Sequence, residues 1–291
     1  MAAKNRSLLG PIGLVWRSVV VGLIYVVTSM ITDSLGSSMG VVSDIPISVD
    51  PTIALLSMFV GGTLISLVMG PISTKLTLPH AQRIGVLFLV LYMFAYLIGA
   101  PEVALFTTYS LQFQAFILIM QFIVNLILAV SIGILFPSPQ IRTGLMKEVR
   151  GYFAKRKEGE WLWRFGLASV LFFPIYFFFG FVFSSITGPY YNNPELGLSL
   201  VIPSFEIMLP VELVRGLIYA LTVVPLLAVI RMPKWRLGLW MGLILAIVGA
   251  AVPQLVNVAW PLPLRLGHGV EMVLDSFAQG LMMAWLLWVE K

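Results

Sequence analysis

The chain has 291 residues, of which 59% are hydrophobic and only 11% are charged. Its mean hydropathy is +0.97, and soluble domains carry about 25% charged residues, so a water-soluble globular fold is excluded. The chain has no cysteine, which rules out disulfides, thiolate nucleophiles and cysteine-ligated metals. The net charge of +5 does not indicate a nucleic-acid partner, because in so apolar a chain the positions of basic residues matter more than their sum.

Long apolar segments dominate the chain. A helix needs roughly 20 residues to cross a hydrocarbon core of about 30 Å. Eight segments meet this requirement, so we predict an all-α fold: a polytopic bundle of about eight transmembrane helices, forming one domain over residues 1–291. The predicted spans are 14–35, 53–74, 84–104, 110–136, 164–186, 208–230, 237–259 and 268–289.

The basic residues predict the orientation. Of the 18 Lys and Arg residues, all except Arg215 and Arg265 fall at span ends or in loops on one side of the predicted bundle. Such one-sidedness is typical of cytoplasmic loops. We therefore expect both termini to be cytoplasmic, with the chain in the plasma (inner) membrane of a bacterial-type cell.

The longest predicted cytoplasmic connection, residues 137–163, has an amphipathic pattern. Ile141, Leu145, Val149 and Phe153 recur every four residues among basic side chains. The pattern predicts a basic amphipathic helix, and we favour a position on the anionic inner membrane surface. Docking of a partner protein is the alternative.

Two predicted outer loops, 36–52 and 187–206, are rich in Pro, Gly, Ser and Asn and almost free of basic residues. Ordered loops of this length are often lids or binding loops. Residues 190–193, Tyr-Tyr-Asn-Asn, are interpreted either as ligand contacts or, preferentially, as an aromatic anchor at the membrane interface.

The chain also carries a sign of internal duplication. A Trp-Arg pair opens the first span at 16–17 and the fifth at 163–164, and an Arg-x-Gly motif recurs at 83–85 and 236–238. Each half would supply four spans that start on the same side, so the repeat would be parallel, about an axis along the membrane normal. Basic span boundaries produce the same short motifs without duplication. If the repeat is real, the second half carries the embedded charges and the first serves mainly as scaffold.

Ionisable side chains inside the predicted spans mark a candidate site. Glu212 and Arg215 of the sixth span share a helical face and are close enough to pair. The end of the seventh span adds two amides, Gln254 and Asn257, at a similar depth.

The last span carries the most informative pattern, a polar stripe of His268, Glu271, Asp275 and Gln279 on one helical face. At 1.5 Å per residue the stripe runs roughly 16 Å, about half the hydrocarbon thickness. The predicted topology places it, with the sixth- and seventh-span residues, in the outer half of the membrane. We therefore expect a polar site that faces outwards.

Two interpretations of this site compete. The polar residues could be interhelical glue, which is common in membrane bundles. The charge count favours a functional site. Three acids, Glu212, Glu271 and Asp275, face one embedded cation, Arg215. Arg265 and His268 are the further side chains that could supply positive charge. An acidic excess in a low dielectric must take up protons, a metal or another cation.

The preferred function is the binding or transport of a small polar solute or ion, or of a lipid-like ligand, coupled to carboxylate protonation. In this hypothesis Arg215 holds an anionic group, whereas Gln254 and Asn257 orient the solute. The binding candidates are Glu212, Arg215, Gln254, Asn257, His268, Glu271 and Asp275.

Two alternatives remain open. A membrane-embedded, metal-assisted hydrolase or transferase would use His268 and Glu271 as ligands of a divalent metal. One histidine with carboxylates is a thin ligand set for zinc, so no cofactor is expected. A non-catalytic subunit would instead use the stripes as glue and pack against another membrane protein or a second copy of the chain. The lipid bilayer is the expected surrounding in every case.

Overall fold

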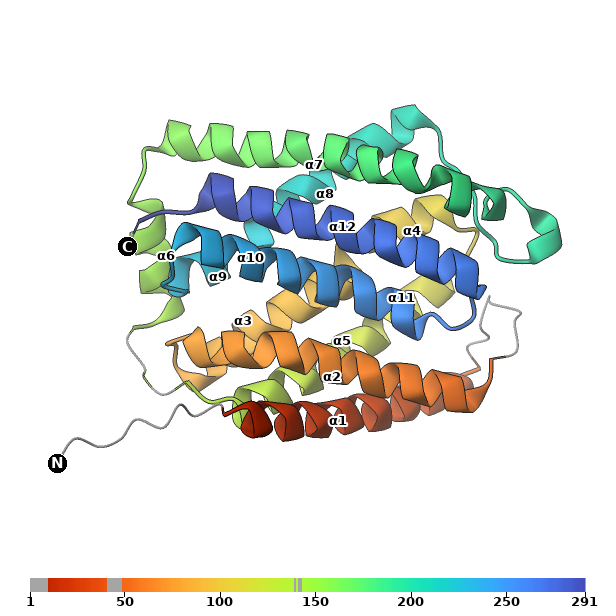
Figure 1. Ribbon diagram of the computed structural model, residues 1–291, viewed down its shortest axis with the longest axis horizontal. Coiled ribbons are helices and arrows are strands. Elements are labelled where there is room, and N and C mark those ends of the chain that lie inside the picture. The colour runs from red at the N-terminus through yellow and green to blue at the C-terminus, as the bar shows by residue number, and fades with distance from the viewer. Residues whose placement is uncertain (1–9, 41–48, 139, 141–142, 291) are drawn as a thin grey trace.

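The computed structural model describes residues 10–40, 49–138, 140 and 143–290. Regular structure in these ranges is helical apart from one isolated β-bridge, and the long helices lie side by side in one bundle (Figure 1). The α-helices are α1 (Pro11–Ser38), α2 (Pro51–Lys75), α3 (His80–Tyr92), α4 (Ala100–Phe106), α5 (Leu111–Leu135), α6 (Leu145–Phe153), α7 (Glu158–Thr187), α8 (Phe205–Thr222), α9 (Val224–Val229), α10 (Lys234–Ile244), α11 (Val252–Val256) and α12 (Leu262–Leu287). Two π-helices, η1 (Met93–Leu97) and η4 (Leu245–Ala251), and two 3₁₀ turns, η2 (Gly188–Tyr190) and η3 (Pro194–Leu196), complete the described elements.

The prediction of a multi-span helical membrane protein is confirmed. Eight helical units of the described chain are long and apolar enough to cross a membrane, and each overlaps one predicted span. The beginning of α1 and the end of α12 lie at the same end of the bundle (Figure 1). We call this the basic end, because Lys75, Arg83 and Arg164 lie at the helix termini there; the opposite end is called the far end.

Three of the eight spans are interrupted rather than continuous. The third consists of α3, η1 and α4, the sixth of α8 and α9, and the seventh of α10, η4 and α11. In each case a proline lies in the first turn of the new segment: Pro101 in α4, Pro225 in α9 and Pro253 in α11. Proline has no N–H to donate to the preceding turn, so the hydrogen-bond ladder breaks at these positions.

Glycines allow several helices to approach closely. A Cβ at Gly62 would lie 2.6 Å from Cβ of Tyr25 on α1, and a Cβ at Gly216 would lie 2.6 Å from Cβ of Phe172 on α7. A Cβ at Gly280 would lie 2.6 Å from backbone atoms of α10. Larger side chains at these positions would force the helices apart.

The helices pack in a pattern that recurs in the two halves of the chain. In the first half α1 packs on α2, α3 on α5, and α1 on α5; in the second half α7 packs on α8, α10 on α12, and α7 on α12. The halves meet where η1 packs on η4, α2 on α11, and α4 on α8. The two π-helices therefore take part in the contact between the halves.

Helix α6 lies within the segment that was expected to form an amphipathic helix. The described helix covers only Leu145–Phe153, and its apolar residues Leu145, Val149 and Phe153 pack against the protein core. Ile141 lies outside the described residues. The apolar face is thus turned towards the basic end of the bundle, whereas Met146 of the same helix is exposed.

Three side chains at the basic end hold the last turn of α12. Tyr152 donates to the carbonyl of Leu287, and Arg156 and Arg164 donate to the carbonyls of Trp288 and Leu286, each at 2.6 Å. The terminal carbonyls of a helix have no partner within the helix and carry partial negative charge, so cationic donors satisfy them well. Burial raises the pKa of the Tyr152 hydroxyl, which therefore remains a donor.

Candidate functional site

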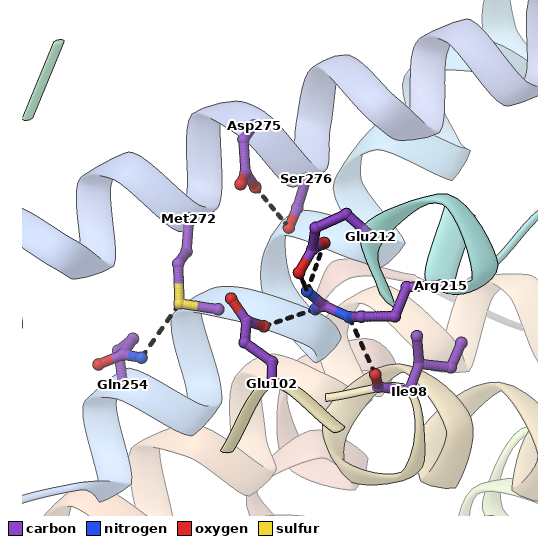
Figure 2. A network of polar contacts seen from close by, with 8 residues as sticks. All are labelled: Ile98, Glu102, Glu212, Arg215, Gln254, Met272, Asp275 and Ser276. Carbon is purple, nitrogen blue, oxygen red and sulfur yellow. Dashed lines mark hydrogen bonds and ion pairs between the residues drawn. The ribbon is translucent and has the colours of Figure 1, made fainter. Parts of the chain in front are cut away.

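The centre of the candidate site is the guanidinium of Arg215 on α8, which is 5% exposed. Its Nη1 donates to both carboxylate oxygens of Glu212 at 2.7 Å, one turn earlier on the same helix. Its Nη2 lies 2.6 Å from Oε2 of Glu102 on α4, and its Nε donates to the carbonyl of Ile98 at 3.0 Å (Figure 2). The cation is thus shared between its own helix and the third span.

The break in the third span makes the Ile98 carbonyl available. The N–H of Ile98 closes η1 by donating to Met93 at 3.0 Å, and α4 begins anew with Val103 donating to the carbonyl of Gly99 at 2.9 Å. Because Pro101 interrupts the ladder between them, the guanidinium of Arg215 satisfies the carbonyl that precedes α4.

Glu102 was missed by the sequence analysis, which assigned the embedded charges of the site to the second half of the chain. The residue lies in the first turn of α4, where an acidic side chain is favourable, and the Pro-Glu pair at 101–102 was the available signal. Its contact with Arg215 also corrects the interpretation of the first half as mere scaffold, because the first half supplies both Glu102 and the Ile98 carbonyl to the site.

The polar stripe of α12 lies on the inner face of the helix, as predicted. Glu271 and Asp275 are each 7% exposed, and Gln279 is 2% exposed. His268 Nδ1 lies 3.1 Å from Glu271 Oε2, whereas Asp275 accepts a hydrogen bond from the neighbouring Ser276 hydroxyl at 3.0 Å. Figure 2 shows the Asp275 carboxylate pointing from α12 towards the Arg215 group, and it lies within electrostatic reach of Glu102 and Arg215.

We call Glu102, Glu212, Arg215, His268, Glu271 and Asp275 the polar cluster. It contains four carboxylates, one guanidinium and one imidazole. The Arg265 guanidinium donates instead to the carbonyls of Gln254 and Leu255 at the end of α11, and it makes no ion pair with these carboxylates in the described chain. The cluster therefore has a larger acidic excess than the sequence alone indicated.

The two amides of the seventh span take different positions. Gln254 lies beside α12, where its Nε2 donates to the sulfur of Met272 at 3.1 Å, while its Oε1 is buried without a partner among the described residues (Figure 2). Asn257 ends α11 and is half-buried; its side chain makes no hydrogen bond to the polar cluster in the described chain. The structure thus brings Gln254, but not Asn257, towards the site.

The loop between α7 and α8 covers the cluster from the far end. Thr107 and Leu200 form the isolated bridge, with Val201 donating to the carbonyl of Phe106 at 2.9 Å. Tyr191 packs edge-on against Phe106, with ring centroids 6.1 Å apart. Burial raises the pKa of Tyr191, and the charges of Glu102 and Glu271 raise it further. The Tyr191 side chain also packs against the small apolar cluster of Leu198, Leu200 and Leu264.

A metal centre finds little support in the donor set. His268 and Glu271 come together as predicted, but no group of three or more His, Asp or Glu side chains in the described ranges is arranged to hold a metal ion. Catalytic zinc sites use three protein ligands.

No protein-family model, curated protein or solved structure matches the chain. The chemistry of the polar cluster is therefore the basis for a functional proposal.

Replacing the buried cation should destabilise the protein strongly. Arg215→Gln leaves Glu212 in the bundle interior without its partner, a change that costs about 3–5 kcal/mol for buried ion pairs. We expect a large fall in the melting temperature of the purified protein in detergent, and a partial recovery in the double variant Glu212→Gln/Arg215→Gln.

Arg236→Gln is the matched control, since Arg236 is exposed at the basic end and lies over the Trp235 ring. Its melting temperature should stay close to that of the unmodified protein. An Arg215→Gln variant as stable as this control would show that the ion pairs contribute nothing.

Proposed function

We propose that this protein binds or translocates a small polar solute or ion, and that this step is coupled to protonation of carboxylates in the polar cluster. The observation that carries the proposal is the charge imbalance around Arg215. One guanidinium is already engaged by Glu102 and Glu212, while Asp275 and Glu271 lie close by with His268 as the further titratable base.

Burial explains why this imbalance matters. A carboxylate in a low dielectric is costly unless a cation or several hydrogen-bond donors compensate it. Asp275 is 7% exposed and accepts one hydrogen bond, from Ser276. Its charge is therefore best relieved by taking up a proton or a cation. Helix glue alone requires no such excess of acids.

The orientation follows from the basic residues. We place the basic end in the cytoplasm of a bacterial-type cell, which makes both termini cytoplasmic. The polar cluster then lies in the outer half of the bilayer, with the loop that carries Tyr191 above it. A solute would reach the carboxylates from the outside.

The four-plus-four repeat gains support from equivalent contacts in the two halves. The same number of residues separates Gly22 from Ser169 and Tyr25 from Phe172, and it also separates the two Trp-Arg pairs. A Cβ at Gly62 meets Tyr25 and Gly22, and a Cβ at Gly216 meets Phe172 and Ser169. We propose that the halves are parallel repeats.

The third and seventh spans support the same repeat. Each begins after a proline, Pro79 or Pro233, continues through a π-helix, and resumes at Pro101 or Pro253. Ligand sites of repeat-built transporters lie at the interface between repeats, beside interrupted helices. The contact of Arg215 with Ile98 and Glu102 crosses this interface, which favours transport over catalysis by a metal.

Protonation can be tested directly by infrared spectroscopy of the purified protein. We expect a C=O stretching band from a buried, protonated carboxyl group near neutral pH, and we expect Asp275→Asn to remove it. Glu195→Gln is the control, because Glu195 is exposed in the α7–α8 loop. A spectrum without this band, or a band that survives Asp275→Asn, would count against proton uptake at Asp275.

The repeat predicts matched effects at the two glycines. Gly62→Ala and Gly216→Ala should each lower stability by about 1–3 kcal/mol through overpacking, in a thermal-melting assay. Gly85→Ala and Gly166→Ala are controls, because nothing lies within 4 Å of a Cβ at either position. If one of the tested pair behaves like a control and the other does not, the halves do not share this packing.

A further inference from the structure

The charge of the ligand can be argued from the side chains that are still able to bind one. Arg215 already directs Nε to Ile98, Nη1 to both oxygens of Glu212 and Nη2 to Glu102. It is also 5% exposed and lies over the Phe172 ring at 5.8 Å. The guanidinium is therefore committed to the protein, so the expectation that it holds an anionic group does not fit its contacts.

The groups that remain are mainly hydrogen-bond acceptors. Asp275 uses one oxygen for Ser276, and Oε1 of Gln254 is buried without a partner in the described chain. An anion would add charge beside four carboxylates, whereas a cation would offset them. Electrostatics therefore selects a positively charged ligand.

Tyr219 gives independent evidence for a ligand. The side chain is 6% exposed, and its ring is stacked between Phe94 and Phe172 at centroid distances of 5.5 and 5.2 Å. Its hydroxyl makes no hydrogen bond to any described residue, although it lies within electrostatic reach of Asp275. A polar group on so deeply placed a side chain almost always has a hydrogen-bond partner in native structures, from the protein or from water.

Gln279 is a second largely buried polar side chain. It lies one turn after Asp275 on the same face of α12 and is 2% exposed. Its amide makes no hydrogen bond within the described ranges. Tyr219 and Gln279 are thus two largely buried polar side chains within reach of Asp275, and water or a ligand completes their hydrogen bonds.

We infer that the site takes a small monovalent cation, an alkali-metal ion or a protonated amine, which binds the Asp275 carboxylate together with the Tyr219 hydroxyl and the Gln279 amide oxygen. The inference rests on the proposed function, because cation and proton compete for the same carboxylate: the proton leaves Asp275 as the cation binds. A divalent ion is disfavoured, since it prefers several carboxylates and no group of three or more His, Asp or Glu side chains in the described ranges is arranged to hold a metal ion.

The test is the melting temperature of the purified full-length protein in NaCl, KCl or methylammonium chloride, against N-methyl-D-glucamine chloride at equal ionic strength. A ligand that binds only the folded state raises the melting temperature with the logarithm of its concentration. We expect at least one probe cation to raise it by about 5 °C at one hundred times its dissociation constant. The active probe then distinguishes a metal ion from an amine.

Raising the proton concentration should weaken this shift, because the proton occupies the same carboxylate. Asp275→Asn should abolish the shift, and Tyr219→Phe, which keeps the stacked ring, should weaken binding about tenfold. Glu195→Gln should leave it unchanged. The inference is overturned if no probe cation shifts the melting temperature, if sodium acetate or phosphate acts through its anion instead, or if the shift survives Asp275→Asn.

The infrared band of Asp275 separates failure of this inference from failure of the proposed function. A protein that shows the protonated carboxyl band but no cation shift retains proton uptake and lacks the cation site. A protein whose melting temperature rises with the cation but which lacks the protonated carboxyl band has the cation site and no proton on Asp275. That result would overturn the proposed competition between cation and proton.

Discussion

The arrangement of the bundle depends on one buried guanidinium. Arg215 connects α8 to the third span through Glu102 and the Ile98 carbonyl, and it neutralises Glu212 within its own helix. In a membrane interior a lone arginine is costly, and so is a lone glutamate. Glu102 and Glu212 therefore both depend on the Arg215 guanidinium. The guanidinium in turn depends on the break in the third span, because that break frees the Ile98 carbonyl to accept from it.

This constraint links backbone irregularity to chemistry. Proline and π-helical turns are tolerated in membrane helices where other groups satisfy the freed backbone atoms. Here η1 and η4 pack against each other, and a Cβ at Gly249 of η4 would lie 3.3 Å from the carbonyl of Phe94 in η1. The interrupted segments therefore meet where the two halves are in contact, beside the charged groups, and the continuous helices surround them.

Much of the fold could be predicted from the sequence. Eight apolar runs of sufficient length predicted the eight spans, and the spacing of His268, Glu271 and Asp275 predicted the inner face of α12, because period and length are local properties. The pairing of Glu212 with Arg215 followed from their separation by one turn.

The features that the sequence did not predict depend on tertiary contacts. Glu102 lies near the end of its span and shows no helical stripe, so only the folded structure brings it to Arg215. The π-helices leave no periodic signal in an apolar run. The sequence predicted the amphipathic helix α6 but not its packing on the core, because an amphipathic pattern does not distinguish a protein core from a lipid interface. The engagement of Arg215 by Ile98, Glu212 and Glu102 is likewise a three-dimensional property.

The most direct test of this account is a double-mutant cycle between Glu102 and Arg215, using Glu102→Gln, Arg215→Gln and the double variant. The measured quantity is the free energy of unfolding in mixed micelles. If the ion pair joins the two halves, the two changes will be non-additive by about 1 kcal/mol or more. Additivity within about 0.5 kcal/mol would contradict the account, because it would mean that Arg215 and Glu102 do not interact in the folded protein.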